Sequence, residues 1–394
     1  MTRIVSLAGR GDGLGDDGSY HPRTAPGDVI LVDGRVEQGP HHIEPVCRHF
    51  GVCGGCQLQH VDDEAYSDFL IDRINGALAA QGIETPQFST PHISPPNARR
   101  RVSMHALRRG ESMRPSFTRA SSHQSVEIRQ CPVMCMELER LLKPLGEFLA
   151  KVGRSRRRVE IQLTLVDQGI DLALRNLSVE GLTENEAMIE FAEKNMLARL
   201  SLDEGYGPNA HWEPEPVTVT LGAVAVSFPQ GAFLQATADG EKALVGGVKD
   251  AVLGATRIAD LFAGLGTFSF GVGCHVHAVE GARDAVLALQ GAANRAGRSI
   301  TTEHRDLFRR PLSAAELARF DAIILDPPRA GAKEQVAQIA ASSVPDIAYV
   351  SCNPSTFARD AKALIDGGYR LETIKPVGQF RWSTHVELAA HFRR

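Results

Sequence analysis

The chain has 394 residues, of which 43% are hydrophobic, 23% charged and 6% aromatic, and its formal net charge is −4 at pH 7. This balance is typical of a globular protein, and the slight acidity excludes a global electrostatic attraction to nucleic acid, so any such binding must come from local patches. The stretch MTRIVSLAGRGDG lacks the apolar core of a secretion signal, and no run is long enough to cross a bilayer. We therefore expect a cytoplasmic protein of two or three domains with no membrane association.

The first part of the chain predicts a small β-module. Residues 1–44 are rich in Gly, Asp and Pro and contain two strand-like segments, TRIVSLA and DVILVDG. From 45 to 235, a helical segment, EAYSDFLIDRINGALAA, and alternating segments such as RVEIQLTLV predict a mixed α+β central domain. Glycine and proline in 205–217 predict a loop within it.

Two arginine-rich stretches lie in this central domain, at 97–109 and 151–160. On charge alone they are equally well explained as solvated surface and as contacts to RNA phosphates.

The region 236–394 repeats a strand, a turn and a helix. The apolar strands RIADLFAG, HVHAVEG, FDAIILD and IAYVSC are each followed by a turn and, in most cases, a helical pattern. This alternation predicts an α/β, doubly wound parallel sheet with helices on both faces. The tail, LETIKPVGQFRWSTHVELAAHFRR, predicts two final strands that form a hairpin at one edge.

A nucleoside-binding site is indicated at the start of this region. Gly264 and Gly266 follow an apolar strand directly, and Glu280 ends the next strand, where a carboxylate can accept both ribose hydroxyls. The third glycine of a dinucleotide fingerprint is absent, so S-adenosylmethionine fits better than NAD. The alternative is an ordinary α/β turn that binds nothing.

Three further polar side chains stand at predicted strand ends. Asp306, Asp326 and Cys352 each follow a strand, and ligands of open α/β sheets bind outside the carboxyl ends of the strands. We therefore expect these groups to converge on one crevice with Gly264 and Glu280.

A thiol beside a methyl donor suggests methylation of a pyrimidine carbon. Carbon 5 of such a ring becomes nucleophilic only after a thiolate adds at carbon 6, and a base must later remove the carbon 5 proton. Cys352 in YVSCNPSTFARD is the candidate nucleophile, and Glu387 in STHVELAAHF is the candidate base. Glu387 could instead be a solvent-facing edge residue, and Asp326 could be a helix cap. Such a pocket requires a flipped or unpaired base, which favours RNA contacts by the arginine stretches.

The cysteine pattern indicates a metal centre. CRHFGVCGGC supplies Cys47, Cys53 and Cys56, and QCPVMC supplies either Cys131 or Cys135 as a distant fourth ligand. Three close cysteines with a distant Cys-Pro favour an iron–sulfur cluster, with Cys131 as the fourth ligand. Zinc and an unligated group of thiols remain alternatives.

These residues together resemble the RNA uracil-C5 methyltransferase family, which makes 5-methyluridine with S-adenosylmethionine. The resemblance covers residues 45–394 and is specific, because C-x5-C-G-G-C, a later Cys-Pro, DLFAGLGTF, DPPRAG, SCNPSTFARD and HVE occur in the order typical of the family. It implies a Rossmann-like class I methyltransferase domain at 236–394, a central iron–sulfur and RNA-binding domain at 45–235, and a nucleophile and base at Cys352 and Glu387. It also implies cofactor contacts and ligands of a 4Fe-4S cluster, namely Gln235, Phe262, Glu280, Asp306 and Asp326 for the cofactor, and Cys47, Cys53, Cys56 and Cys131 for the cluster.

The cysteines favour the 23S ribosomal RNA members of the family over the transfer RNA members, and we expect a monomer. Three features depart from the family pattern: Thr237 replaces a common Asn, Gly378-Gln379-Phe380-Arg381 replaces Asp-x-Phe-Pro, and the amino-terminal module is shorter than an RNA-binding TRAM domain. The alternatives are an amino-directed methyltransferase and a non-catalytic iron–sulfur protein that binds RNA.

Overall fold

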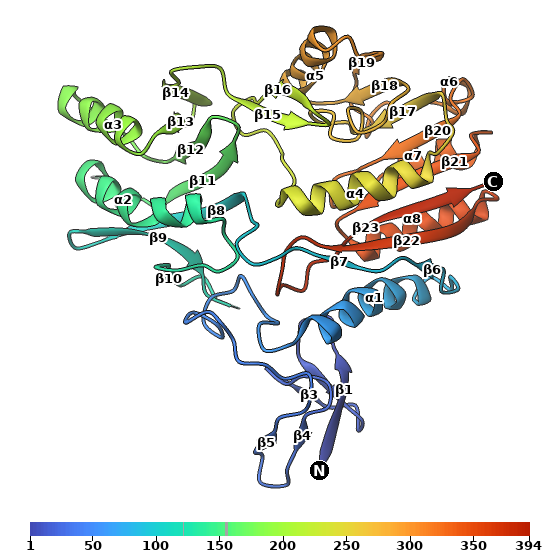
Figure 1. Cartoon of the computed structure of the whole chain (residues 1–394), viewed down its shortest axis with the longest axis horizontal. Helices are drawn as coiled ribbons and strands as arrows, with labels where there is room; N and C mark the ends of the chain where they lie inside the picture. The colour runs from blue at the N-terminus through green and yellow to red at the C-terminus, as the bar shows by residue number, and fades with distance from the viewer. Residues whose placement is uncertain (121, 154–156) are drawn as a thin grey trace.

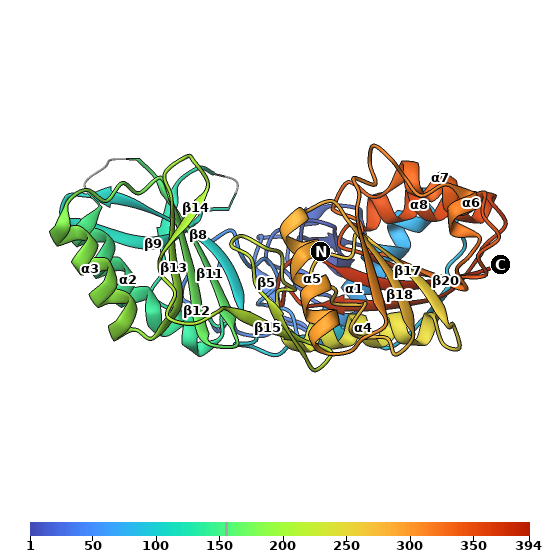
Figure 2. The same cartoon turned by 90° about the horizontal axis from the view of Figure 1, so that it is seen from above.

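The structure is a computed structural model that describes residues 1–394 except 121 and 154–156. Part of the arginine-rich stretch at 151–160 therefore lies outside the described residues. The chain forms a small amino-terminal sheet, a lobe built on a seven-stranded sheet, and a larger lobe built on a nine-stranded sheet (Figures 1 and 2).

The amino-terminal sheet has five short strands in the order β3-β2-β1-β4-β5. Its strands are β1 (Thr2–Leu7), β2 (Gly13–Gly15), β3 (Tyr20–His21), β4 (Val29–Ile30) and β5 (Val36–Glu37). All of its strand pairs are antiparallel. Strands this short bury little apolar surface, and the sheet gains support from the carboxylate of Asp28, which is buried and accepts hydrogen bonds from the backbone of Ala25 and Gly39.

The central lobe combines one sheet with two helices. Its strand order is β10-β9-β8-β11-β12-β13-β14. The strands are β8 (Arg101–Arg109), β9 (Ser112–Thr118), β10 (Ser125–Glu127), β11 (Val159–Val166), β12 (Gly169–Arg175), β13 (Leu197–Asp203) and β14 (Pro208–Trp212), and the helices are α2 (Met136–Val152) and α3 (Leu182–Lys194). Strand β14 falls in the segment 205–217, which we predicted to be a loop. That prediction was wrong for these five residues because PNAHW has no alternation of apolar side chains.

A hairpin of β15 (Thr218–Leu221) and β16 (Val224–Ser227) leads from the central lobe to the nine-stranded sheet. The order of that sheet is β19-β18-β17-β20-β21-β23-β22-β6, and β7 also pairs with β22. Its strands are β17 (Arg257–Leu261), β18 (His275–Glu280), β19 (Ile300–His304), β20 (Ala322–Leu325), β21 (Asp346–Ser351), β22 (Arg370–Gly378), β23 (Glu387–Arg393), β6 (Gln87–Phe88) and β7 (His92–Ile93). The strands from β17 to β21 are parallel, and β22 and β23 form the predicted antiparallel hairpin.

Helices cover both faces of this sheet, as the alternation of strands and helices predicted (Figure 1). The helices of this lobe are α1 (Asp63–Ala79), α4 (Ala238–Ala251), α5 (Arg283–Arg295), α6 (Ala314–Leu317), α7 (Lys333–Ala340) and α8 (Pro354–Asp366). Helices α1, α7 and α8 pack on one face, and α4 and α5 pack on the other. The central strand β20, AIIL, is buried at every position because both of its faces are covered.

The carboxyl-terminal sheet draws on the range 45–235 that we assigned to the central domain. Helix α1 packs against α8, and its Tyr66 and Phe69 are buried in the core below the sheet. Strands β6 and β7 then pair with β22. Asp62 caps α1 by accepting a hydrogen bond from the backbone of Ala65 at 2.9 Å, which fixes where this segment enters the lobe.

None of the helices in the described part of the chain combines the length and the apolarity that a bilayer crossing needs.

Candidate active site

The polar residues predicted at strand ends lie at one edge of the parallel sheet. Strands β17, β18, β20 and β21 run side by side in the same direction, so Glu280, Asp326 and Cys352 stand at neighbouring carboxyl ends. The backbone N–H of Asp326 also donates to the carbonyl of Leu261 at 3.2 Å. The chain order changes direction between β17 and β20, and this is the switch point at which open α/β sheets bind ligands.

Glu280 is joined to the glycine turn after β17. One oxygen of its carboxylate accepts a hydrogen bond from the N–H of Gly264 at 2.9 Å, and the other accepts one from the N–H of Ala282 at 2.7 Å. Each oxygen keeps a further lone pair for a hydroxyl group. Gly264 has a φ of +55° and has open space where a side chain would stand. The backbone at this turn can therefore approach a ligand closely.

The same turn contains a strained aromatic residue. Phe262 has a φ of +63°, although it is not a glycine, and its ring lies 5.3 Å from that of Phe308. Gly266, with a φ of +92°, has no room for a side chain without displacing Leu289, whose atoms would lie 3.0 Å from it. Strain of this kind is most often retained at binding sites, which agrees with a ligand beside these rings.

Asp306 follows β19 and is exposed. Its Oδ1 accepts hydrogen bonds from the N–H groups of Phe308 and Arg309, at 3.0 and 3.3 Å. The carboxylate therefore organises the turn that carries Phe308, while its second oxygen lies 3.4 Å from the guanidinium of Arg309.

Gln235 is buried and lies beside the loop between β22 and β23. Its Oε1 accepts a hydrogen bond from Nε2 of Gln379 at 2.8 Å, and Oε1 of Gln379 accepts one from the backbone of Thr237 at 3.4 Å. Thr237 caps α4 by accepting a hydrogen bond from the N–H of Gly240 at 3.1 Å. Thr237, which replaces the asparagine common in the family, thus still caps the helix, since threonine and asparagine are both good N-cap residues.

Asp326 and Glu387 form an acidic pair in a poorly hydrated setting. Burial raises the pKa of Glu387 to about 7, and a hydrogen bond from Gln379 lowers it only in part. Burial also raises the pKa of Asp326 well above its usual value, and the charge of Glu387 raises it further. Two carboxylates so close do not ionise together at low cost. Helix α7 begins at Lys333, so Asp326 does not serve as its N-cap.

Cys352 stands where β21 passes into α8. Asn353 caps that helix by accepting a hydrogen bond from the N–H of Ser355 at 3.1 Å, and Pro354 occupies its first turn. The pKa of Cys352 is raised to about 11, chiefly by burial and then by the charges of Glu387 and Asp326, while the charge of Arg329 lowers it in part. The thiol is partly exposed and lies within the electrostatic reach of both carboxylates.

Sequence reasoning missed two residues of this site. Asp260 is fully buried on β17, burial raises its pKa to about 7, and its Oδ1 has no hydrogen-bond partner, while Oδ2 accepts from Ser269 at 2.5 Å. A carboxylate between the apolar residues of the strand RIADL could have identified it. Gln379 belongs to the segment Gly378-Gln379-Phe380-Arg381, which differs from the family pattern. Only its hydrogen bond to Gln235 in the structure shows that it belongs to the site.

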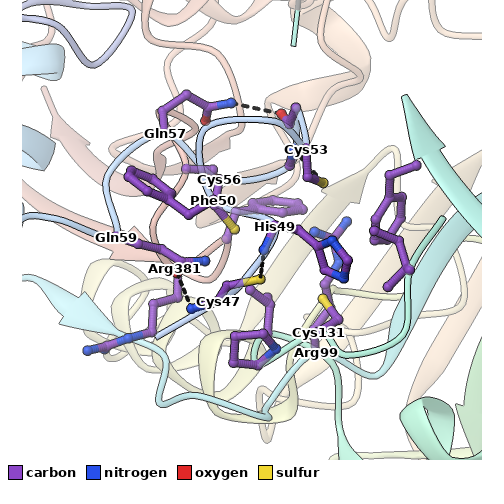
Figure 3. Close-up of a pocket in the computed structure, with 18 of the residues that line it drawn as sticks. Cys47, His49, Phe50, Cys53, Cys56, Gln57, Gln59, Arg99, Cys131 and Arg381 are labelled. Atoms are coloured by element: carbon purple, nitrogen blue, oxygen red, sulfur yellow. Dashed lines mark hydrogen bonds between the residues drawn. The ribbon is translucent and has the colours of Figure 1, made fainter. Parts of the chain in front are cut away.

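The four predicted cysteine ligands line one cavity of about 340 Å³, shown in Figure 3. Cys47, Cys53 and Cys56 come from one loop, and Cys131 comes from the turn before α2. The sulfur of Cys47 accepts a hydrogen bond from the N–H of His49 at 3.4 Å, and that of Cys53 accepts one from Gly55 at 3.5 Å. Cys135 is buried in the central core and is absent from the residues that line this cavity.

The same cavity contains polar groups without partners. Nε2 of His49 and Nε of Arg381 are buried and have no hydrogen-bond partner. Arg99 also lines the cavity, and no carboxylate in the described part of the chain forms an ion pair with it. Burial lowers the pKa of Arg99, whereas the neighbouring sulfurs of Cys131 and Cys56 raise it. A shielded cation with unpaired donors beside it favours an anionic occupant.

The thiols are nevertheless spread out. Among the described residues, the one group of three or more possible ligand atoms within 4.8 Å of one another is His41, Asp62 and Glu64. The four sulfurs are therefore not gathered around a single ion, as tetrahedral zinc would require. A cluster, in which each thiolate binds a different iron atom, needs wider spacing.

Comparisons with known proteins agree with this geometry. Residues 227–394 match the family model described as tRNA (Uracil-5-)-methyltransferase. An uncharacterized RNA methyltransferase of Zymomonas mobilis is 52% identical over 396 residues, which cover 100% of both chains. The 23S rRNA (uracil(1939)-C(5))-methyltransferase of Halomonas elongata is 31% identical, over 94% of this chain and 80% of its own.

The chain belongs to the RNA uracil-C5 methyltransferase family.

A solved member confirms the fold. The Pyrococcus abyssi tRNA (uracil-54, C5)-methyltransferase in complex with S-adenosyl-L-homocysteine has a TM-score of 0.73 with this chain at 21% identity, and the match covers 100% of both chains. The nine-stranded sheet therefore has the Rossmann-like fold of that structure, as the sequence predicted. The expected enzyme class is likewise confirmed.

Proposed function

We propose that this protein methylates carbon 5 of a uridine in RNA with S-adenosylmethionine as the methyl donor. The observation that carries the proposal is the convergence of Cys352, Glu387 and Asp326 at the strand ends beside the Gly264 turn. A nucleophilic thiol and a carboxyl with a pKa of about 7 are the two groups that C5 chemistry needs and that an amine acceptor does not need.

The substrate that we favour is 23S ribosomal RNA. The Halomonas relative carries that name, and the three cysteines of the C-x5-C-x2-C pattern line one cavity here together with Cys131. Transfer RNA is the second candidate, because the matching family model and the Pyrococcus structure carry transfer RNA names.

Bound S-adenosylmethionine would supply an electrophilic methyl carbon on a sulfonium. Around it, Glu280 would accept the ribose hydroxyls, and the ring of Phe262 would pack on the cofactor. Gly264 and Gly266 would let the backbone approach it. Gln235, Asp306 and Asp326 are the remaining proposed contacts, from the loop before α4 and the ends of β19 and β20.

Each of the two catalytic residues has one role in the reaction. The thiolate of Cys352 adds to carbon 6 of the uracil, and the electron pair of the 5,6 double bond moves toward the C4 carbonyl. Carbon 5 would then bond to the methyl carbon as that carbon's bond to the donor sulfur breaks, and the donor would leave as the neutral thioether S-adenosylhomocysteine. Glu387 takes the proton from carbon 5, the double bond re-forms, and the bond between sulfur and carbon 6 breaks to release Cys352.

The electrostatics of the site set a condition on this sequence. Because the charges of Glu387 and Asp326 both raise the pKa of Cys352, thiolate formation is favoured while the carboxyls are protonated. Arg329 acts in the opposite direction and lowers that pKa. Proton abstraction, in contrast, requires ionised Glu387, whose pKa of about 7 allows both states at neutral pH.

The cysteine cavity fits a 4Fe-4S cluster held by Cys47, Cys53, Cys56 and Cys131. Thiolate is the ligand that such clusters take, and hydrogen bonds from N–H groups to sulfur accompany it here. Arg99 would balance part of the negative charge of the group, and the unpaired nitrogens of His49 and Arg381 lie in the same cavity. Protein purified without oxygen should be brown and contain iron and sulfide, and zinc without iron would refute this assignment.

Trapping with RNA that contains 5-fluorouridine tests the reaction. Fluorine cannot leave as a proton, so the adduct with Cys352 should persist and migrate as a denaturation-resistant complex. Cys352→Ala should abolish both trapping and turnover, whereas Cys274→Ala, on the loop before β18, is the matched control and should retain both. Turnover that survives Cys352→Ala would refute the proposed mechanism.

A further inference from the structure

Residues 379–386 form the loop between β22 and β23. Its residues Phe380, Arg381, Ser383, Thr384 and His385 line the cavity that the cysteines also line. Glu387 follows the loop directly as the first residue of β23. One short segment thus connects the cavity to the proposed base.

The backbone of this loop is held from the segment that follows Cys56. The carbonyl of Trp382 accepts hydrogen bonds from the N–H groups of Gln57 and Leu58, at 2.8 and 2.9 Å. The hydroxyl of Tyr66, on α1, lies 3.3 Å from the carbonyl of Phe380 and 3.2 Å from that of Ser383. Trp382 has a φ of +61°, a conformation that a non-glycine residue keeps only when its surroundings impose it.

Arg99 makes the side-chain connection. Its guanidinium lies over the ring of Phe380, 5.0 Å from the ring centroid, and that ring lies 5.7 Å from the ring of His385. The backbone of Arg99 is fixed on the side of the cluster ligand Cys131, because its N–H donates to Val133 at 3.0 Å and its carbonyl accepts from Cys135 at 2.9 Å. The contact path therefore runs from the Cys131 turn through Arg99 to the loop.

We propose that the cysteine cavity fixes the active-site loop, and that Arg99 is the positioning residue that sets the placement of Glu387. This inference rests on the proposed function, since it concerns the step in which Glu387 removes the carbon 5 proton. Arg99 touches no reacting atom. Its loss would leave attack by Cys352 intact, because Cys352 lies between β21 and α8, and would slow the release of the adduct.

The test separates these two steps. Formation of the covalent complex is measured with 5-fluorouridine RNA, and its decay is measured with ordinary uridine RNA in single-turnover experiments. For Arg99→Met and the milder Arg99→Lys, complex formation should stay near the wild-type rate while decay slows roughly 10- to 100-fold, the usual cost of misplacing a catalytic group by about 1 Å. An adduct with unmodified RNA should therefore accumulate.

Arg319→Met is the matched control. Arg319 also lies over an aromatic ring, 4.9 Å from the centroid of Phe320, but it does not line the cavity or belong to the loop. The adduct of this variant should therefore decay at the wild-type rate. Iron and sulfide content, measured on every variant, shows whether the cavity is loaded alike. A merely structural role for Arg99 would reduce formation and decay together, and that result would overturn the inference.

The outcomes also distinguish the two proposals. If wild-type protein formed no complex with 5-fluorouridine RNA, the proposed function would be refuted. If wild-type protein formed it and both Arg99 variants released their adducts as fast as wild type, only the positioning role would be refuted.

Discussion

The charge of Glu387 should destabilise the folded protein above neutral pH, and Glu387→Gln should remove that cost. Burial raises the pKa of this carboxyl from 4.5 to about 7. A shift of about 2.5 pKa units, at ~1.4 kcal/mol per unit, corresponds to roughly 3 kcal/mol of folding free energy. The folded state holds the extra proton between these two pKa values. This contribution to the free energy of unfolding is therefore fully present below pH 4.5, decreases as the pH rises, and is lost above about pH 7.

The assay is urea unfolding of the wild type and of Glu387→Gln at pH 4.5 and pH 8. Glutamine cannot ionise, so the variant should be more stable than the wild type by roughly 3 kcal/mol at pH 8 and by little at pH 4.5. Glu334→Gln, which removes an exposed carboxylate on α7, is the control and should show no such dependence on pH. A gain in stability that is equal at the two pH values would refute the electrostatic explanation. The same variant should accumulate the covalent RNA adduct.

Three further changes have defined outcomes. Asp171→Asn removes one partner of a buried ion pair with Arg199, whose nitrogens lie 2.8 and 2.9 Å from its oxygens, and should cost about 3–5 kcal/mol in urea unfolding. Thr237→Ala removes the cap of α4 and should cost about 1 kcal/mol in the same assay, while Thr237→Asn should cost almost nothing. Gly266→Ala, at a φ of +92° and crowded by Leu289, should weaken S-adenosylmethionine binding in calorimetry, and unchanged affinity would contradict a role of this turn.

The parts of the fold that follow local patterns were predictable. Apolar strands followed by turns and helices identified the parallel sheet, because β17, β20 and β21 are buried on both faces and are mostly apolar, with β20 a continuous apolar run. The placement of Glu280 and Cys352 at strand ends followed from the same rule.

Partnerships between distant segments were not predictable. Strands β6 and β7 have two residues each, and nothing in QF or HI shows that they pair with β22 nearly 300 positions later. The pairing of Gln235 with Gln379 and the placement of Arg99 over Phe380 depend on tertiary packing in the same way. The raised pKa of Glu387 arises from burial, which spacing in the sequence does not report.

The attachment of β6 and β7 to β22 has a consequence for biosynthesis. The chain emerges from the ribosome with its amino terminus first, so α1 and these two strands must wait, unpaired, until the final hairpin has been made. Until then, Phe69 and its apolar neighbours on α1 have no core to enter. The lobe built on the nine-stranded sheet is therefore completed late in synthesis. A fragment that begins at 236 would lack β6 and β7 and would leave the outer edge of β22 open to self-association.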